Sequence, residues 1–255
     1  MRFNALYTLL PTFKKRIMYR SKIELHNIDC LPFMKQCKDK QFDLAIVDPP
    51  YGIERFKKES KSNNRVEKFF NTGEWNNNVP TKEYFNELFR ISKNQVIWGY
   101  NHLSDLLPKT SGFIFWNKHQ NGNFSEGELA WCSLGNGKYF DRAYQKDIGG
   151  KIHPTQKPIE LYEWILEHYA TCKTCNNEGG YYEDVAGDGG SQMWQHCDDC
   201  DNVKPKILDT HLGSGSIAIA CDEYGFDLTA CEIDKDYFNK ASKRLEPYRK
   251  QRTLF

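Results

Sequence analysis

The stretch Ile207-Leu-Asp-Thr-His-Leu-Gly-Ser-Gly-Ser216 decides the fold of this 255-residue chain. A short apolar strand runs into a glycine-rich turn, and residues 216–223 then have the pattern of a helix. Parallel α/β sheets bind nucleotide-like ligands with this unit, because glycines let the backbone approach a ligand at the carboxyl ends of the strands. Such a turn can also simply connect a strand to a helix, so a second feature is needed to choose.

An acidic residue at the end of the next predicted strand supplies that feature. Glu232 closes residues 228–232 and follows Gly213 by 19 residues. A carboxylate in that place can accept hydrogen bonds from both hydroxyls of a ribose. The turn lacks the third glycine of the GxGxxG pattern, which disfavours NAD. The sequence therefore predicts a site for an adenosyl ligand.

Strands and helices alternate along the rest of the chain. The predicted strands are residues 42–47, 95–98, 112–116, 129–132, 206–209 and 228–232, and the predicted helices are residues 81–91, 158–169, 216–223 and 236–245. Strands that are apolar along their whole length are typical of sheets buried on both faces. We therefore predict an α/β fold, an open twisted sheet with helices on both faces.

A second motif, Asp48-Pro-Pro-Tyr51, ends the predicted strand 42–47. Pro49 and Pro50 force a turn there. The Asp48 carboxylate and the Pro49 carbonyl can hold both hydrogens of an exocyclic amino group on adenine or cytosine, which directs its lone pair toward a methyl donor. The Tyr51 ring can stack on a flipped-out base. The alternative is an ordinary turn with a packed tyrosine.

A third motif, His153-Pro-Thr-Gln-Lys-Pro158, precedes the predicted helix 158–169 and by itself indicates only a helix-initiating loop. Taken together, the three motifs resemble those of the DNA amino-methyltransferases that use S-adenosylmethionine. The catalytic motif precedes the cofactor motif, which is the circularly permuted order of the β group. The resemblance covers residues 22–169 and 204–255, and it implies a seven-stranded, Rossmann-like methyltransferase fold.

The resemblance also implies roles for individual residues. Asp48, Pro49, Pro50 and Tyr51 are expected to form the catalytic loop, and Glu232 is expected to bind the ribose. The expected cofactor-binding residues are Asp29, Lys157, Asp209, His211, Gly213, Ser214, Gly215 and Glu232. Those expected to surround the methionine part of the cofactor are Asp209, Gly213 and Gly215.

Two positions depart from the family pattern. Asp29 is expected to contact the adenine amino group, but Ile28 stands where the family has a glycine before it. His211 lies in a segment that more commonly reads Asp-Pro-Phe, which leaves its role open. Lys157 is the expected cofactor contact of the third motif.

These residues predict a site-specific enzyme that methylates N6 of adenine in double-stranded DNA. The nearest alternative is N4 of cytosine, since the same carboxylate serves either amino group. A zinc-ribbon binding protein on an inactive methyltransferase scaffold is a different class, and the intact Asp48, Tyr51, Gly213 and Glu232 argue against it. Methylation of RNA or protein is a third alternative. The resemblance implies a cytoplasmic enzyme of bacterial or phage origin.

A basic segment follows the catalytic motif directly. Residues 55–68 hold six cations and two anions. A solvated charged loop is one interpretation, and contact with DNA phosphates beside the base pocket is the other. The candidate DNA-binding residues are Lys57, Lys58, Lys61, Arg65 and Lys68.

Four of the nine cysteines form two CxxC pairs within residues 170–203. Their spacing is typical of a structural zinc site with four cysteine ligands, which could fold a segment with few hydrophobic residues. A ligand set that includes His196, or a redox pair, are the alternatives. The predicted zinc ligands are Cys172, Cys175, Cys197 and Cys200. We therefore expect a zinc-ribbon-like insertion at residues 170–203, within a methyltransferase domain formed by residues 21–169 and 204–255.

Charge is distributed unevenly along the chain. The net charge of +1 argues against a nucleic-acid partner, but residues 171–202 carry seven anions and one cation, and the first 20 residues carry five cations and no acid. DNA affinity is therefore expected to rest on the local patch at residues 55–68. A homodimer, and a protein partner for the acidic segment, are compatible with the sequence.

The ends and the compartment follow from composition. A mean hydropathy of −0.72 and the lack of an apolar run of about 18 residues exclude an integral membrane protein. Cysteines in CxxC pairs fit a reducing cytosol. Residues 1–20 do not resemble a signal peptide, because most of their charges follow the apolar stretch 5–10 and no cleavage site of small residues appears. We expect a disordered basic leader there, with a DNA-touching arm as the alternative.

Overall fold

The computed structural model describes residues 21–52, 79–120, 125–143, 151–153, 155–174, 180–184, 192–198 and 205–252. The predicted leader, residues 1–20, and the predicted DNA-binding residues Lys57, Lys58, Lys61, Arg65 and Lys68 lie outside these ranges.

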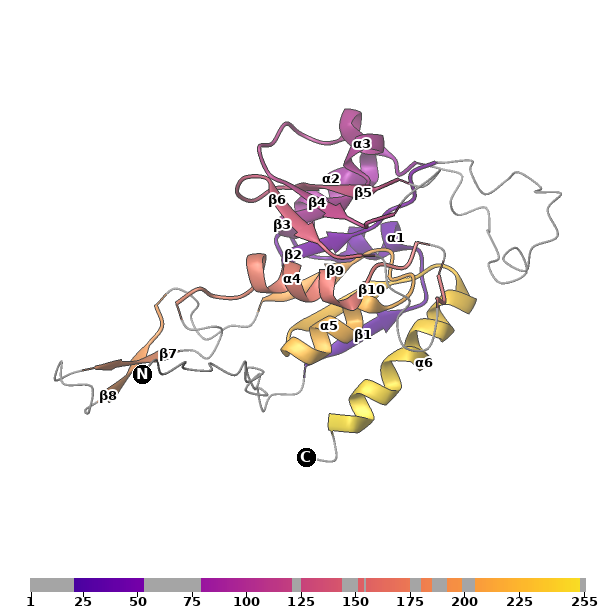
Figure 1. Ribbon diagram of the computed structural model, residues 1–255. Helices are drawn as coiled ribbons and strands as arrows, with labels where there is room; N and C mark the ends of the chain where they lie inside the picture. Colours follow the sequence, from indigo (N-terminus) through magenta and orange to yellow (C-terminus); the bar gives the residue numbers. More distant parts are fainter. Residues whose placement is uncertain are drawn as a thin grey trace, which may run out of the picture.

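Eight strands form one sheet in the order β1-β10-β9-β2-β3-β5-β4-β6 (Figure 1). The strands are β1 (Ile23–His26), β2 (Phe42–Val47), β3 (Ser92–Trp98), β4 (Phe113–Asn117), β5 (Gly127–Cys132), β6 (Lys138–Asp141), β9 (Lys206–Asp209) and β10 (Asp227–Cys231). Strand β5 runs antiparallel to β3 and β4, and the other neighbouring pairs are parallel. The carboxyl ends of β10, β9 and β2 therefore meet at one edge of the sheet.

The central strand β2 shows why the sheet is covered on both faces. Successive side chains of a strand point to opposite faces. Leu44 and Ile46 belong to one buried cluster, and Ala45 and Val47 belong to the other. An unbroken apolar strand is the sequence pattern that this double burial requires.

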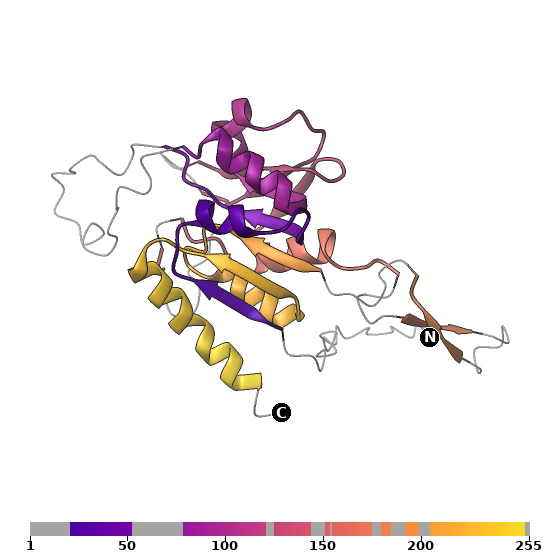
Figure 2. The same cartoon turned by 180° about the vertical axis from the view of Figure 1, so that it is seen from behind.

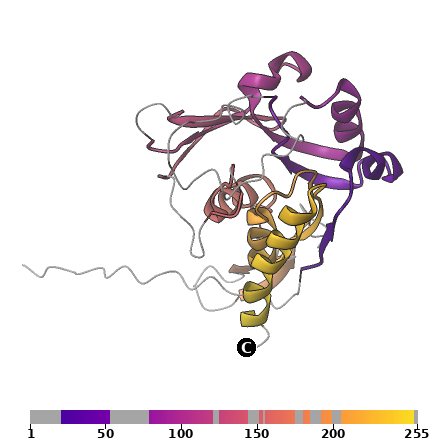
Figure 3. The same ribbon diagram turned by 90° about the vertical axis from the view of Figure 1, so that its right-hand side faces the viewer.

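Helices cover both faces of the sheet (Figures 2 and 3). They are α1 (Cys30–Gln36), α2 (Lys82–Ile91), α3 (Tyr100–Leu103), η3 (Ser104–Leu106), α4 (Ile159–Tyr169), α5 (Ser216–Tyr224) and α6 (Lys235–Arg252). Buried side chains of α1, α2 and α3 share one cluster, and those of α4, α5 and α6 share the other. The predicted open α/β sheet with helices on both faces is confirmed.

Three details differ from the sequence prediction. Strands β1 and β6 and the helices α1, α3 and η3 were not predicted, and the described part of the sheet has eight strands rather than seven. Helix α6 continues past Leu245 to Arg252, with Pro247 inside it. The extra turns carry Arg249, whose Nη2 donates to the Ser21 carbonyl at 3.3 Å and whose Nε lies 3.5 Å from the Asp222 carboxylate. These long-range contacts hold the helix onto the domain beyond the proline.

The segment between α4 and β9 contains a separate antiparallel pair, β7 (Gly180–Asp184) and β8 (Gln192–His196). Figures 1 and 2 show this hairpin projecting away from the main sheet. It lies inside the predicted insertion at residues 170–203. Among the described helices, none combines the length and the apolar character needed to cross a membrane.

Candidate active site

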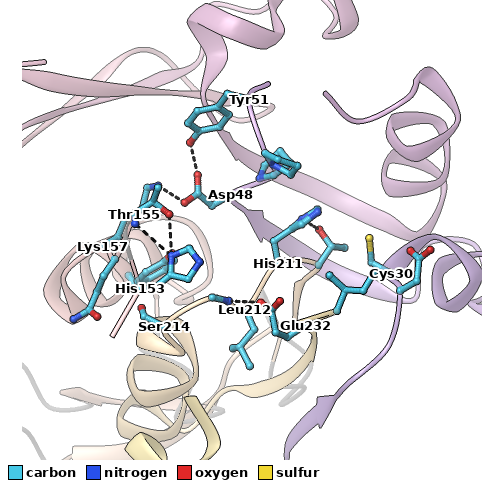
Figure 4. Close-up of a pocket in the computed structure, with 18 of the residues that line it drawn as sticks. Cys30, Asp48, Tyr51, His153, Thr155, Lys157, His211, Leu212, Ser214 and Glu232 are labelled. Atoms are coloured by element: carbon cyan, nitrogen blue, oxygen red, sulfur yellow. Dashed lines mark hydrogen bonds and ion pairs between the residues drawn. The ribbon is translucent and has the colours of Figure 1, made fainter. Parts of the chain in front are cut away.

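A pocket of about 230 Å³ lies at the carboxyl ends of β2, β9 and β10 (Figure 4). Residues 28–30, 48–51, 153, 155–157, 162, 210–214 and 232–233 line it. It therefore joins all three motifs, which are far apart in the chain. The first two meet because β2 pairs in parallel with β9, and β9 with β10. The third is held beside them by the Lys157–Asp48 ion pair and by the Ser216 hydroxyl, which donates to the Lys157 carbonyl at 2.8 Å.

The glycine turn is braced by the carboxylate of Glu232. Its Oε2 accepts the N–H of Gly213 at 2.8 Å, and its Oε1 accepts the N–H of Asp234 at 2.9 Å. Burial raises the pKa of Glu232, and these N–H donors oppose that rise. Gly213 has a φ of +52°, which favours glycine because a side chain is strained there. Both residues line the pocket, as predicted for a nucleotide-like ligand.

Two residues predicted to bind the cofactor lie behind the pocket wall. Among the described residues, Asp209 and Gly215 do not line the pocket. The buried Asp209 accepts the His211 N–H through Oδ1 at 2.9 Å, and burial raises its pKa to about 8. Gly215 has a φ of +72°, and a Cβ there would lie 3.0 Å from the Cβ of Ala241 on α6. Their positions indicate that both shape the turn from behind.

His211, whose role the sequence left open, packs as a neutral aromatic ring. Burial lowers its pKa to about 4. Its Nδ1 lies 2.9 Å from the Thr210 Oγ1, which in turn lies 2.6 Å from the Tyr84 hydroxyl of α2. The His211 and Tyr84 rings meet edge to face with centroids 5.6 Å apart. His211 thereby connects the pocket to α2.

Two large apolar side chains line the pocket and remain exposed. Ile28 and Ile233 both line it and remain 41% and 59% exposed. Asp29 is exposed and lines it too, and its Oδ1 accepts the N–H of Leu31 at 2.9 Å as the N-cap of α1. Large exposed apolar side chains within a pocket favour a flat apolar ligand group between them.

The Asp48 carboxylate has a partner on each oxygen (Figure 4). Its Oδ1 accepts from the Tyr51 hydroxyl, and its Oδ2 lies 2.5 Å from the Lys157 Nζ. Burial raises the pKa of Asp48, and the Lys157 ammonium offsets part of that rise. Asp48 is therefore a preoriented hydrogen-bond acceptor within the pocket.

Lys157 has partners that the sequence did not predict. Its side chain is 1% exposed, and its Nζ lies between Asp48 Oδ2 and Glu128 Oε2, the latter at 3.2 Å. The Nζ also lies 5.1 Å from the centre of the Trp98 ring. Glu128 on β5 was missed by the sequence analysis. The available signal was a carboxylate beside the apolar strand Leu129-Ala-Trp-Cys132.

The ring of Tyr51 lies against the start of α3. It stacks on the His102 ring with centroids 5.4 Å apart and an interplanar angle of 17°. A Cβ on Gly99 would lie 2.1 Å from the Tyr51 Cε1, so only glycine leaves room for the ring in this place. Gly99 also has a φ of +81°, which favours glycine. The described chain thus holds the ring beside the Asp48 carboxylate.

Two of the four predicted zinc ligands are described. The Sγ atoms of Cys172 and Cys197 lie 3.7 Å apart, well beyond the length of about 2.05 Å in a disulfide. Cys175 and Cys200 lie outside the described residues. Within the residues that the structure describes, no three His, Cys, Asp or Glu side chains are grouped so that they could hold a metal ion. The four-cysteine zinc site stays a prediction.

Comparison with known proteins supports the fold. No protein-family model matches the chain. The Type II methyltransferase M1.MboII of Moraxella bovis is 20% identical over 281 residues, which cover 86% of this chain and 95% of that protein.

Two solved structures are similar over most of their length. The M1.HpyAVI–SAM complex has a TM-score of 0.52 and 20% identity, and the match covers 88% of this chain and all of that one. The cytosine-N4-specific PvuII DNA methyltransferase has a TM-score of 0.51 and 11% identity, with 93% and 94% covered. The predicted Rossmann-like methyltransferase fold is confirmed.

Proposed function

We propose that this protein is an S-adenosylmethionine-dependent DNA methyltransferase that acts on N6 of adenine in a flipped-out base. The observation that carries the proposal is that the Asp48 carboxylate and the Gly213–Glu232 brace line one pocket. A methyl donor and an amino acceptor can therefore meet there. The names of M1.MboII, the M1.HpyAVI–SAM complex and the PvuII enzyme support the same class.

The residues present fit S-adenosylmethionine. Each Glu232 oxygen accepts one backbone N–H and keeps a second lone pair for a ribose hydroxyl. Ile28 and Ile233 offer apolar contact for the adenine ring of the cofactor. Asp29, next to Ile28, is the proposed partner of the adenine amino group. Gly213 and Ser214 of the turn, with His211, would line the remainder of the bound cofactor.

The proposed chemistry is direct transfer to the amino nitrogen. When bound, S-adenosylmethionine supplies a methyl group on a positively charged sulfur. Asp48 and the Pro49 carbonyl accept the hydrogens of the target amino group and direct its lone pair outward. As the nitrogen–carbon bond forms, the carbon–sulfur bond would break and leave a neutral thioether, and the surplus proton of the nitrogen would pass to the Asp48 carboxylate or to water. Tyr51 provides the stacking surface for the base, and its hydroxyl must leave Asp48 Oδ1 when the amino group takes that oxygen. No covalent intermediate with a cysteine is needed.

A direct experiment tests the substrate and the base together. Nucleosides from DNA methylated by the purified protein are separated by mass spectrometry, and the DNA is read by single-molecule sequencing. We expect N6-methyladenine at one short sequence. N4-methylcytosine would favour the second candidate, which the PvuII likeness and the shared carboxylate chemistry support. No methylated base, from protein that binds S-adenosylmethionine, would contradict the proposal.

The basic segment after the catalytic motif is proposed to hold DNA phosphates. Changing Lys57, Lys58, Lys61, Arg65 and Lys68 to Gln should weaken binding on all sequences. The slope of log affinity against log salt should fall by about 0.9 for each phosphate that the variant no longer neutralises. Fluorescence anisotropy over a salt series measures this slope.

Lysines at the opposite edge of the sheet provide the control for this experiment. The three lysines stand at the amino ends of β1, β3 and β9, away from the pocket, and are Lys22, Lys93 and Lys206. Their change to Gln should leave the slope close to that of the wild type. An unchanged slope in the five-residue variant would show that the basic segment does not contact phosphates.

The cysteine pairs are proposed to hold a structural zinc ion. The 3.7 Å separation of the Cys172 and Cys197 sulfurs supports this, because two thiolates about 2.3 Å from a tetrahedral zinc lie about 3.8 Å apart. Elemental analysis should find about one zinc per chain, and near zero in the Cys172→Ser/Cys197→Ser variant. Cys37→Ser, a buried cysteine on the domain core, should keep the metal. Wild-type protein without zinc would remove the proposal.

A further inference from the structure

A row of alternating charges runs from the pocket into the sheet. Asp48 Oδ2 lies 2.5 Å from Lys157 Nζ, Lys157 Nζ lies 3.2 Å from Glu128 Oε2, and Glu128 Oε1 lies 3.1 Å from Lys118 Nζ. The four side chains come from the end of β2, the loop before α4, β5 and the residue after β4. Their exposed fractions run from 1% for Lys157 to 28% for Glu128.

Because Lys157 is buried, its charge depends on the two neighbouring carboxylates. A buried ammonium is costly unless opposite charges surround it, and a buried ion pair that loses one partner leaves an uncompensated charge. The two carboxylates hold the pKa of Lys157 above its usual value although burial lowers it. Burial likewise opposes ionisation of Glu128, yet Lys157 and Lys118 hold the pKa of that carboxyl below its usual value. Lys157 is thus a fixed cation with a carboxylate on each side.

The two oxygens of Asp48 differ in how easily a ligand can replace their hydrogen-bond partner. Oδ2 faces the buried Lys157, which Glu128 holds from behind. Oδ1 accepts from the Tyr51 hydroxyl, on a side chain that is only half-buried and lines the pocket. A ligand amino group can displace the tyrosine hydroxyl more easily than a lysine held on two sides. Oδ1 is therefore the oxygen presented to the pocket.

We propose that Lys157 and Glu128 are positioning residues, which fix the Asp48 carboxylate so that Oδ1 faces the target amino group. The inference rests on the proposed function and adds to it a task for Lys157 different from the predicted cofactor contact. Glu128 does not line the pocket among the described residues; it reaches the Asp48 pair by its ion pair with Lys157, and its charge also acts on Asp48 at longer range. Lys118 completes the charge balance on the far side of Glu128.

Substitutions that keep shape and remove charge test this role. In Glu128→Gln and Lys157→Gln, kcat at saturating DNA and cofactor should fall about 30-fold, within the range for a misplaced catalytic group. The calorimetric Kd for S-adenosylmethionine should stay within about two-fold. The double variant should be no slower than Lys157→Gln alone, because the ion pair with Lys157 is the contact by which Glu128 positions Asp48.

A pH profile separates positioning from a merely structural role. Other groups that act on the titration of Asp48, or are acted on by it, are Glu128 of β5, Tyr51 of its own segment, Tyr162 of α4 and Asp209 of β9. Loss of the Lys157 cation leaves burial and the Glu128 charge to disfavour the Asp48 carboxylate, opposed by the Tyr51 hydrogen bond, so the acid limb of the rate profile should move to higher pH in Lys157→Gln. Its position in the matched control Lys93→Gln, which breaks a surface pair with Asp43, should not move.

A readout without catalysis distinguishes failure of this inference from failure of the proposed function. Carbon-13 spectra of protein labelled at the aspartate carboxyls, with Asp48 assigned from Asp48→Asn, give the titration of that group directly. Its midpoint should rise in Lys157→Gln and, if that variant does not fold, the Glu128→Gln kinetics and cofactor affinity decide. An unchanged kcat in Glu128→Gln, or a rise in Kd that accounts for the loss in Lys157→Gln, would overturn the proposal. A wild-type enzyme without methyltransferase activity, but with the expected titration, would instead contradict the proposed function.

Discussion

Asp48→Ala should abolish methyl transfer and leave cofactor binding intact. The substitution removes the carboxylate that would accept a hydrogen from the target amino group, while Glu232 and the glycine turn keep their hydrogen bonds. Loss of an oriented acceptor in a buried site, together with the freed Lys157, is expected to lower kcat by at least about 10³-fold. Transfer of a radioactive methyl group to DNA measures kcat, and calorimetry measures the Kd for S-adenosylmethionine.

A surface carboxylate gives the matched control. Asp39 is also paired with a cation, the Arg90 guanidinium at 2.6 Å, but it is 78% exposed and lies outside the residues that line the pocket. Asp39→Ala should retain wild-type kcat. Retained activity in Asp48→Ala would show that the carboxylate is not the amino-group acceptor, and a weakened cofactor affinity would show that the variant damages the pocket itself.

Glu232→Ala should have the second large effect, on the cofactor. The change removes the proposed acceptor of the ribose hydroxyls and also leaves the N–H groups of Gly213 and Asp234 without their partner. Hydrogen bonds to a charged group contribute about 1.5–3 kcal/mol each. The Kd for S-adenosylmethionine should therefore rise at least about 100-fold, which corresponds to about 2.7 kcal/mol. Calorimetric titration of the cofactor without DNA measures it.

Glu223 offers a comparison within the same part of the fold. It is exposed near the end of α5 and does not line the pocket. Glu223→Ala should keep the wild-type Kd. A Kd for Glu232→Ala within about two-fold of the wild type would mean that the cofactor does not use this carboxylate.

Local patterns carried most of the fold prediction. The apolar strands β2, β9 and β10 lie where the sequence placed them within a few residues, because a strand buried on both faces needs an unbroken apolar run. The motif at residues 48–51 follows β2, Gly213 follows β9 and Glu232 follows β10. Parallel pairing of these strands then brings all of them to one pocket.

Contacts between distant segments were beyond local patterns. The pairing of Lys157 with Asp48 joins residues 109 positions apart, and Glu128 entered the site only because β5 runs antiparallel beside β3. Asp209 and Gly215 match the family pattern, but turn geometry decides which side chains of a motif face the pocket. Helix α6 continues through Pro247 although proline favours an end there, and Arg249 beyond it contacts Ser21 and Asp222, which are far away in the sequence.

The neighbouring strands β2 and β9 have a consequence for the order in which the protein is made. Leu44 of β2 pairs with Ile207 of β9. The ribosome therefore synthesises β2 about 160 residues before the strand that pairs with it. Until then one long edge of β2 lacks its partner, and unpaired strand edges favour association with other chains. The acceptor half of the pocket therefore leaves the ribosome well before the donor half. We expect nascent chains that stop before residue 206 to depend on chaperones and to bind no cofactor.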